Sequence, residues 1–255
     1  MRPLLVDFSF LQVQSYPFIL LLSLLLGVFV GALEARRFNI SPQLILILSI
    51  PTIFSALLGA RVFYLISNFD FTLNSFLYHG GIGFYGGLIS GALCLLFLAY
   101  KNKIPWEPLF SAASPGLSLA HALGRLGCLL KGCCYGKKCD LPWAIYYQDP
   151  LSKAPTNIPL HPSQIYEFIG LIIISIILFI NNRKPLKKGL KSWKIYLFCY
   201  AFLRFFNEFT RGDPSRGQWG ALSPSQWISI AIILVLLLLD FLGARIHKGA
   251  HETRS

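Results

Sequence analysis

The chain has 255 residues, of which 55% are hydrophobic and 13% charged, and its formal net charge is +12 at pH 7. The charged fraction is about half that of an ordinary soluble domain, and apolar runs long enough to cross a bilayer recur along the sequence. These features exclude a soluble globular protein. Lysines and arginines lie mostly in short loops beside apolar segments, without the folded basic domain that duplex binding requires, so we expect no nucleic acid partner.

Seven apolar segments predict an all-α polytopic membrane protein with about seven transmembrane helices. The segments lie near residues 17–33, 42–66, 85–100, 109–130, 162–180, 193–210 and 225–242. No soluble domain fits between them and no internal repeat is present, so we expect a single integral membrane domain over residues 1–255. The first 16 residues hold one arginine and no small-residue cleavage site, so we expect no removable signal peptide.

The distribution of basic residues predicts the orientation in the membrane. Lysine and arginine clusters follow the first, third, fifth and seventh segments, and the ends of odd-numbered segments share one side. By the positive-inside rule that side is the cytoplasm, so we expect the N-terminus outside and the C-terminus cytoplasmic. The unusual loops, rich in glycine or cysteine, then lie on the outer face. We therefore expect the functional site to lie in the outer half of the membrane.

A glycine-rich stretch precedes and enters the third apolar segment. Six glycines occur among the thirteen residues from His79 to Gly91. The spacing of Gly87 and Gly91 is typical of tight helix packing. The number of glycines exceeds what one helix crossing needs, so we also expect an irregular lateral opening where backbone amides approach an anion.

Arginines occur within or beside apolar segments, where a charge is costly. Arg125 sits at predicted membrane depth, at a cost of about 3 kcal/mol on insertion scales. Arg204, Glu208 and Arg211 share one face of a predicted helix, with Glu208 as the clearest acidic partner. Arg125, Arg204 and Arg61 outnumber this acidic partner, which predicts a surplus of buried positive charge. Such a surplus favours phosphate, which a guanidinium group binds through two parallel hydrogen bonds.

The stretch His161-Pro-Ser-Gln-Ile-Tyr-Glu opens the fifth apolar segment. A proline in the first turn and an acidic residue shortly afterwards are typical of a helix start. Polar groups this dense at a membrane boundary also suit a network that orients side chains.

Four cysteines cluster in and after the fourth segment. Cys128, Cys133, Cys134 and Cys139 contain no Cys-x-x-Cys pair, and two adjacent cysteines chelate a metal poorly, so we expect no metal site. If the loop faces an oxidising periplasm, a disulfide from Cys139 to Cys133 or Cys134 is favoured.

In their order along the chain, these motifs resemble those of the bacterial prolipoprotein diacylglyceryl transferase family. The resemblance covers nearly the full length, and its specificity comes from five modest motifs in one order. They are Gly59-Ala-Arg61 with Tyr64, the Gly86-Gly87-Leu-Ile segment, Gly124-Arg125-Leu-Gly127, His161-Pro-Ser163-Gln164-Ile-Tyr166-Glu167, and Arg204 through Glu208 to Arg211. The family's orientation, with the N-terminus outside and the C-terminus inside, agrees with the charge pattern.

The resemblance implies an enzyme of the bacterial inner membrane. It moves the diacylglyceryl group of phosphatidylglycerol to the lipobox cysteine thiol of a preprolipoprotein, so that a thioether forms and glycerol phosphate leaves. Arg125 and Arg204 are then expected to hold the phosphodiester and stabilise the leaving phosphate. The thiol needs a base or a positive field to become a thiolate. No metal or organic cofactor is implied.

The other residues of the shared motifs are expected to bind the substrates. They are Arg61, Tyr64, Gly86, Gly87, Gly124, Gly127, His161, Ser163, Gln164, Tyr166, Glu167, Glu208 and Arg211.

The sequence departs from the family pattern around the expected catalytic centre. Tyr85 stands where the family usually has a histidine, Cys128 stands where it usually has an asparagine, and the acidic residue expected near Cys133 is absent. His121 lies one helical turn before Arg125. One hypothesis is that His121 supplies the imidazole that position 85 lacks, and another is that the Tyr85 phenol takes part. The alternative is that His121 is a neutral, packed residue.

Two other functions fit the same motifs. A divergent relative could use another acceptor, because the catalytic centre is altered. A transporter or lipid-binding protein could use the arginines merely to hold an anion, although transporters often show repeats, which are not visible here. The sequence leaves the oligomeric state open.

Overall fold

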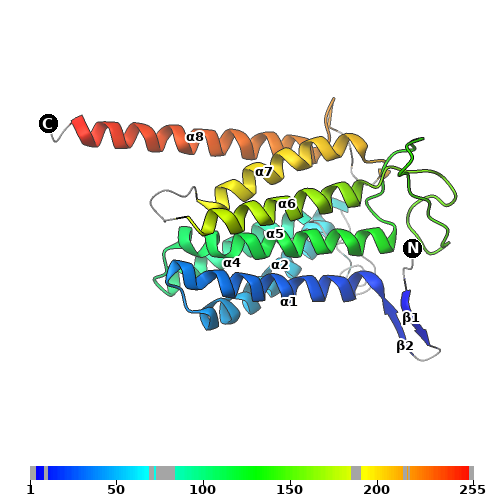
Figure 1. The fold of residues 1–255 in the computed structure, drawn as a ribbon, viewed down its shortest axis with the longest axis horizontal. Helices are drawn as coiled ribbons and strands as arrows, with labels where there is room; N and C mark the ends of the chain where they lie inside the picture. The colour runs from blue at the N-terminus through cyan, green and yellow to red at the C-terminus, as the bar shows by residue number, and fades with distance from the viewer. Residues whose placement is uncertain are drawn as a thin grey trace. The chain divides into compact units, whose positions relative to one another are not determined.

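The computed structural model describes residues 4–8, 11–68, 72, 84–184, 191–214, 217 and 219–252. These residues form seven long helices, two short 3-10 turns and a short antiparallel hairpin (Figure 1). The elements are β1 Leu4–Phe8, β2 Leu11–Gln14, α1 Ser15–Ala35, α2 Pro42–Asn68, α4 Phe84–Lys101, α5 Trp106–Lys131, α6 Ser163–Asn182, α7 Ser192–Asn207 and α8 Pro224–Glu252. Each predicted apolar segment overlaps one of the helices.

Four helical stretches in the described chain are long and apolar enough to cross a membrane. They are Ser15–Phe38, Pro42–Ile66, Ser163–Asn182 and Pro224–Leu242, and Gly86–Lys101 is a shorter apolar helix. Large hydrophobic side chains such as Leu25, Ile50 and Leu237 are exposed on these helices, as expected for surfaces that face lipid. The prediction of an all-α polytopic membrane protein is confirmed, whereas the number of crossings and the orientation stay predictions.

The backbone divides into two compact units. One unit comprises Met1–Gly27 and Ser114–Ser255, and the other comprises Val28–Ala113, so the division falls within α1 and α5. The expectation of one integral domain over residues 1–255 stays a prediction.

In the unit of residues 28–113, α2 and α4 approach closely because small residues line their contact. A Cβ atom on Gly87 would lie 3.0 Å from the carbonyl oxygen of Ala56, and one on Gly91 would lie 3.1 Å from the Ala56 Cβ. The Ser55 hydroxyl donates to the Ser90 carbonyl at 3.1 Å, and the Ser90 hydroxyl donates in return at 2.9 Å. The packing interpretation of Gly87 and Gly91 is confirmed. The predicted lateral opening falls largely on residues 79–83, which lie outside the described residues.

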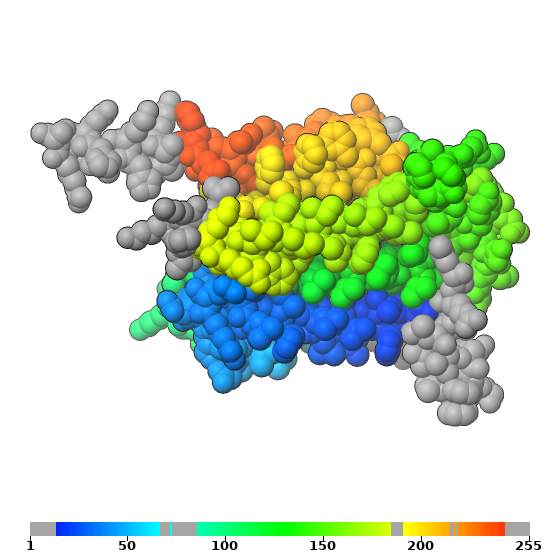
Figure 2. All heavy atoms as spheres, in the orientation of Figure 1, coloured from blue at the N-terminus to red at the C-terminus, as the bar shows by residue number. Residues whose placement is uncertain are grey.

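In the other unit, α6 lies between α5 and α7, and α7 packs against α8 (Figure 1). The Ser118 hydroxyl of α5 donates to the Leu171 carbonyl of α6 at 2.9 Å, and the Ser175 hydroxyl of α6 donates to the Pro115 carbonyl at 3.1 Å. The space-filling view shows α6 covering much of α5 on one face (Figure 2). The buried apolar cluster that joins α5, α6 and α7 consists of Ala122, Leu171, Ile174, Leu178, Tyr196 and Tyr200.

The polar loop between α5 and α6 folds against the end of α7. A backbone bridge joins Gly136 to Arg211, and the amide of Lys137 donates to the Thr210 carbonyl at 2.8 Å. Inside the loop, Tyr147 and Leu160 are buried together. The loop, which begins at the C-terminal end of α5, is therefore held by backbone hydrogen bonds against the residues that follow α7.

Substituting Gly86→Ala tests the close contact of α2 and α4. The added Cβ would clash with the Gly59 carbonyl oxygen and with Phe63, and such overpacking costs about 1–3 kcal/mol. We expect a lower thermal unfolding temperature in detergent. The matched control is Gly124→Ala on α5, where a Cβ meets no atom within 4 Å. Equal unfolding temperatures for the two variants would contradict this packing.

Candidate functional site

A buried carboxylate joins three helices of the larger unit. Glu167 lies near the start of α6 and is 1% exposed. Its Oε1 lies 2.7 Å from Arg125 Nη2 on α5, and its Oε2 lies 3.5 Å from Arg204 Nη1 on α7. The Tyr200 hydroxyl donates to Oε1 at 3.3 Å and the Asn207 amide to Oε2 at 3.1 Å. Glu167 therefore brings the two predicted catalytic arginines to one point.

Arg204 has two further partners. Its Nη2 lies 2.8 Å from Glu208 Oε2, one helical turn away, as the spacing predicted. The same nitrogen donates to the Ser225 hydroxyl of α8 at 3.0 Å. Arg204 is thus held by side chains from α6, α8 and its own helix.

Arg211 forms a separate ion pair just beyond α7. Its Nε and Nη2 donate to the two carboxylate oxygens of Asp213 at 2.8 and 2.6 Å. Burial lowers the pKa of Arg211, but the Cys134 thiol and the hydrogen bond to Asp213 raise it, and the net shift is upward. Arg211 is therefore a permanent cation here.

In this unit the predicted surplus of buried positive charge is wrong. Arg125 and Arg204 are matched by Glu167 and Glu208, and Arg211 is matched by Asp213. The error has a physical cause: helix spacing identified Glu208, whereas Glu167 and Asp213 reach the arginines only through the tertiary fold. Net charge alone therefore does not select an anion at this site.

Unused hydrogen-bond donors remain on both guanidinium groups. Arg125 Nε and Arg204 Nη1 are buried and have no hydrogen-bond partner among the described residues. A buried donor without an acceptor costs about 1–3 kcal/mol. On the same helix, a Cβ on Gly124 would meet no atom within 4 Å. The site thus offers charged donors to an anionic ligand.

His121 belongs to the same network. Its Nε2 lies 3.2 Å from Arg125 Nη2 and 4.0 Å from Glu167 Oε1, and its Nδ1 lies 3.3 Å from the Tyr196 hydroxyl. A guanidinium group can only donate, so Nε2 accepts from Arg125. The imidazole is therefore neutral, with its hydrogen on Nδ1. Its ring also meets the edge of Tyr200, with centroids 4.7 Å apart.

The residues that open α6 tie the neighbouring loops to the helix. The Gln164 amide donates to the Cys133 carbonyl at 2.8 Å and to the Tyr147 hydroxyl at 2.9 Å. The Ser163 hydroxyl lies 2.8 Å from the Thr210 hydroxyl. Burial raises the pKa of Tyr147, although the hydrogen bond from Gln164 opposes this, so the phenol stays neutral. These contacts agree with an orienting network.

His161 and Tyr166 lie at the exposed side of this network. The Tyr166 hydroxyl accepts from the Trp143 indole at 2.8 Å and lies 3.3 Å from His161 Nδ1. These residues therefore hold the loop over the start of α6.

Several predicted site residues lie elsewhere. Arg61, Tyr64, Gly86 and Gly87 belong to the unit of residues 28–113, where Gly86 and Gly87 contact α2, and their role with substrate stays a prediction. A Cβ on Gly127 would lie 3.3 Å from the Tyr16 ring, so this glycine lets α1 approach α5. The side chain of Tyr85 lies outside the described residues.

The sequence interpretation missed several members of the network. They are Tyr196, Tyr200, Asn207, Asp213 and Ser225. A signal was present on α7, because Tyr196, Tyr200 and Arg204 recur at intervals of four residues and so share one face. No comparable local pattern indicates Ser225 or Asp213.

Comparison with known proteins places this site in a family. The family model described as prolipoprotein diacylglyceryl transferase matches residues 3–242. A Clostridium perfringens protein named phosphatidylglycerol–prolipoprotein diacylglyceryl transferase 2 is 34% identical over 99% of this chain and 99% of its own length. Proteins named phosphatidylglycerol–prolipoprotein diacylglyceryl transferase from Clostridium tetani and Streptococcus mutans are 32% and 29% identical, over 92% and 96% of this chain and 95% and 96% of their own lengths. The chain therefore belongs to the prolipoprotein diacylglyceryl transferase family, to which its five motifs had pointed.

Proposed function

We propose that this chain transfers the diacylglyceryl group of phosphatidylglycerol to the lipobox cysteine of a preprolipoprotein, with release of glycerol phosphate. The proposal rests on one observation: in a chain of this family, Glu167 pairs with both Arg125 and Arg204, and each guanidinium group keeps a nitrogen that makes no hydrogen bond to the described residues. Relatives that are 34% and 32% identical to this chain bear the name of this activity.

Arg125 and Arg204 are suited to bind the lipid phosphate. Arg125 Nε has no hydrogen-bond acceptor among the described residues, and Arg204 Nη1 has only the 3.5 Å ion pair to Glu167, so phosphate oxygens would accept from both. Because Glu167 and Glu208 neutralise the two arginines, the buried site does not need the anion for its stability. A monoanionic phosphodiester then gains hydrogen bonds without displacing that carboxylate.

The same arginines would stabilise the leaving group. When the carbon–oxygen bond to phosphate breaks, the phosphate gains a second negative charge. Guanidinium groups fixed in advance by Glu167, Glu208 and Ser225 need little rearrangement to meet that charge. Differential binding of the more negative transition state lowers the barrier.

Two groups are candidates for the base that removes the proton from the acceptor thiol. If a bound phosphate draws Arg125 away from His121 while the pair with Glu167 stays, the lone pair of His121 Nε2 becomes free to accept the thiol proton. The phenol of Tyr85 is the alternative, at the position where the family usually has a histidine. In both cases the nearby positive charge of the arginines favours the thiolate.

We propose that the protein works in the bacterial inner membrane with its N-terminus outside and its C-terminus in the cytoplasm. The support is the alternation of basic clusters along the sequence. In this orientation, the network at the start of α6 and the end of α7 faces the outer leaflet, where a lipoprotein precursor would arrive.

The decisive experiment is a reconstitution. Purified protein is incubated with phosphatidylglycerol and a lipobox peptide, and the products are separated by mass. Diacylglyceryl-peptide together with glycerol phosphate supports the transferase. Reaction with a different thiol only would support the divergent relative, and lipid binding or uptake without products would support a non-enzymatic protein.

Lysine substitution at either arginine tests the guanidinium geometry. Arg125→Lys and Arg204→Lys keep the charge but lose the planar donors, so we expect transferase kcat/KM to fall by about 100-fold or more. The matched control is Arg183→Lys, an exposed arginine after α6. Near-normal rates in Arg125→Lys would contradict phosphate binding through the guanidinium Nε.

Removing the central charge tests the role of Glu167 in stability. Glu167→Gln leaves Arg125 and Arg204 without their shared carboxylate, and breaking such a buried pair costs about 3–5 kcal/mol. We expect a clear drop in the unfolding temperature, measured in detergent. Asp140→Asn, the same chemical change at an exposed position, should leave it unaltered. A stable Glu167→Gln protein would show that the arginines do not depend on this carboxylate.

Two substitutions separate the candidates for thiol activation. We expect His121→Ala to lower kcat by about 100-fold, the size of a general-base contribution, if the imidazole accepts the thiol proton. Full activity in His121→Ala would exclude that role. Tyr85→Phe, measured in parallel across pH, tests the phenol.

A further inference from the structure

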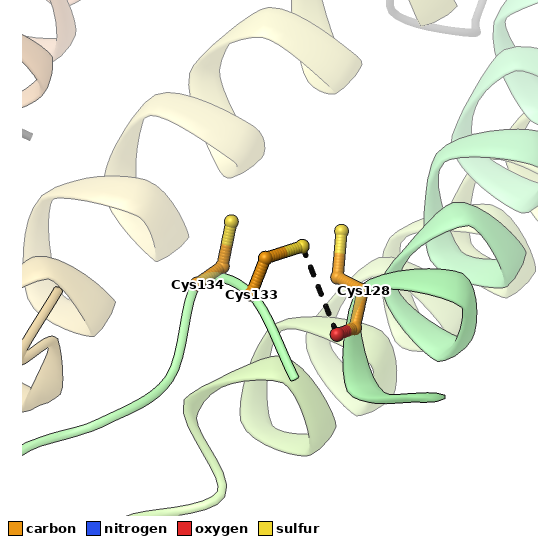
Figure 3. A group of neighbouring side chains, drawn as sticks. All are labelled: Cys128, Cys133 and Cys134. Atoms are coloured by element: carbon orange, nitrogen blue, oxygen red, sulfur yellow. Dashed lines mark hydrogen bonds between the residues drawn. The ribbon is translucent and has the colours of Figure 1, made fainter. Parts of the chain in front are cut away.

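Three cysteine thiols gather beside the arginine site. Cys128 lies in the last turn of α5, and Cys133 and Cys134 lie in the loop that follows. Their sulfur atoms all lie within 4.8 Å of one another, and all three cysteines are free (Figure 3). Cys139, which the sequence interpretation favoured as a disulfide partner, is also free and lies outside this group.

A sharp turn of the backbone brings the three sulfurs together. The amide of Cys133 donates to the carbonyl of Cys128 at 3.1 Å, which folds the chain back over the helix end. Gly132 has φ +72° and Cys134 has φ +60°, and the left-handed conformation is uncommon for a residue with a side chain. The sequence spacing alone did not predict this convergence, because the turn, and not a Cys-x-x-Cys pattern, creates it.

The spacing of the sulfurs suits a metal ion. Zinc–thiolate bonds of about 2.3 Å in tetrahedral geometry separate sulfur pairs by about 3.8 Å. Thiols that already lie within 4.8 Å of one another reach this arrangement by small side-chain rotations. Soft thiolate ligands select zinc or copper(I) over magnesium or calcium.

Two arginines lie near the cysteine cluster along the backbone. Three thiolates and one Zn²⁺ carry a net charge of −1. Arg125 precedes Cys128 by about one helical turn on α5. The segment after Cys134 also pairs with the segment of Arg211, through the bond from the Gly212 amide to the Tyr135 carbonyl at 3.0 Å. The backbone therefore brings the segments of Arg125 and Arg211 to the cluster, with both arginines already paired to Glu167 and Asp213.

We propose that Cys128, Cys133 and Cys134 bind a zinc ion whose fourth ligand is the thiolate of the acceptor cysteine. This inference rests on the proposed transferase function. Three protein ligands with one open position are typical of catalytic zinc sites. A zinc ion deprotonates a coordinating thiol outright, so the site supplies a thiolate in a chain that has Tyr85 in place of the family's usual histidine.

The reaction balances without a redox step. Coordination of the acceptor thiol releases its proton to water. The thiolate sulfur attacks the glyceryl carbon of the lipid, a carbon–sulfur bond forms, and the carbon–oxygen bond to phosphate breaks. The electron pair leaves with glycerol phosphate, whose new charge faces Arg125 and Arg204. The thioether product is neutral and a poorer zinc ligand than a thiolate, so it dissociates.

Cobalt(II) is the probe that tests the site. The full-length protein in lipid nanodiscs is reduced, freed of metal by a chelator and titrated with cobalt(II). We expect one ion per chain with thiolate-to-metal absorption, and at least about tenfold weaker binding in Cys133→Ser and Cys134→Ser. The matched control is Cys139→Ser, which changes a free cysteine of the same loop outside the cluster. No cobalt binding, or equal binding in all variants, overturns the proposal.

A second measurement uses the unaltered protein, so misfolded variants cannot obscure the answer. Zinc should protect Cys128, Cys133 and Cys134 from a thiol-alkylating reagent and leave Cys139 reactive, as read by peptide mass. A lipobox peptide should change the cobalt absorption, whereas the same peptide with serine in place of cysteine should not. Absence of protection, or an unchanged spectrum with the cysteine peptide, overturns the proposal.

Activity separates this inference from the proposed function. Transferase activity that persists in metal-free protein overturns the zinc site and leaves the transferase intact. Absence of transferase activity in both metal-loaded and metal-free protein contradicts the proposed function itself.

Discussion

The pairing of Glu167 with Arg125 and Arg204 is the interaction on which the larger unit depends. Each arginine sits in a helix where an uncompensated charge is costly, and Glu167 contacts both at 2.7 and 3.5 Å, while Glu208 supplies the second negative charge. Because these partners come from α5, α6 and α7, the pairing also fixes how the three helices meet. The apolar cluster around Leu171 joins the same three helices.

This arrangement explains how the protein interior can hold two arginines without being destabilised. Charges balanced within the protein avoid the penalty of an unpaired ion, and the remaining N–H groups of the arginines are available to a ligand. Neighbouring groups such as Tyr200 and Asn207 hold the carboxylate from two further directions. A preorganised site of this kind needs little reorganisation when charge develops in a reaction.

The sequence interpretation succeeded where the signal is local. The apolar runs predicted the helices, and the spacing of Arg204 and Glu208 predicted their ion pair. It failed where contacts join distant segments: Glu167 was expected only as a substrate-binding residue, although it is the shared partner of both arginines. The sequence interpretation also missed the convergence of the three cysteines, because the spacing of residues gives no sign of the turn at Gly132 and Cys134.

The sequence by itself determined the class of protein, the family and the residues that carry the charge, since these follow from composition and from short motifs in a fixed order. Only the tertiary structure decided which charges meet. Side chains from different helices come within hydrogen-bond distance through packing, and packing depends on contacts between residues far apart in the chain. Arg125 therefore has its partner 42 positions away, in Glu167, and the interaction that organises the site is visible only once α5 and α6 lie side by side.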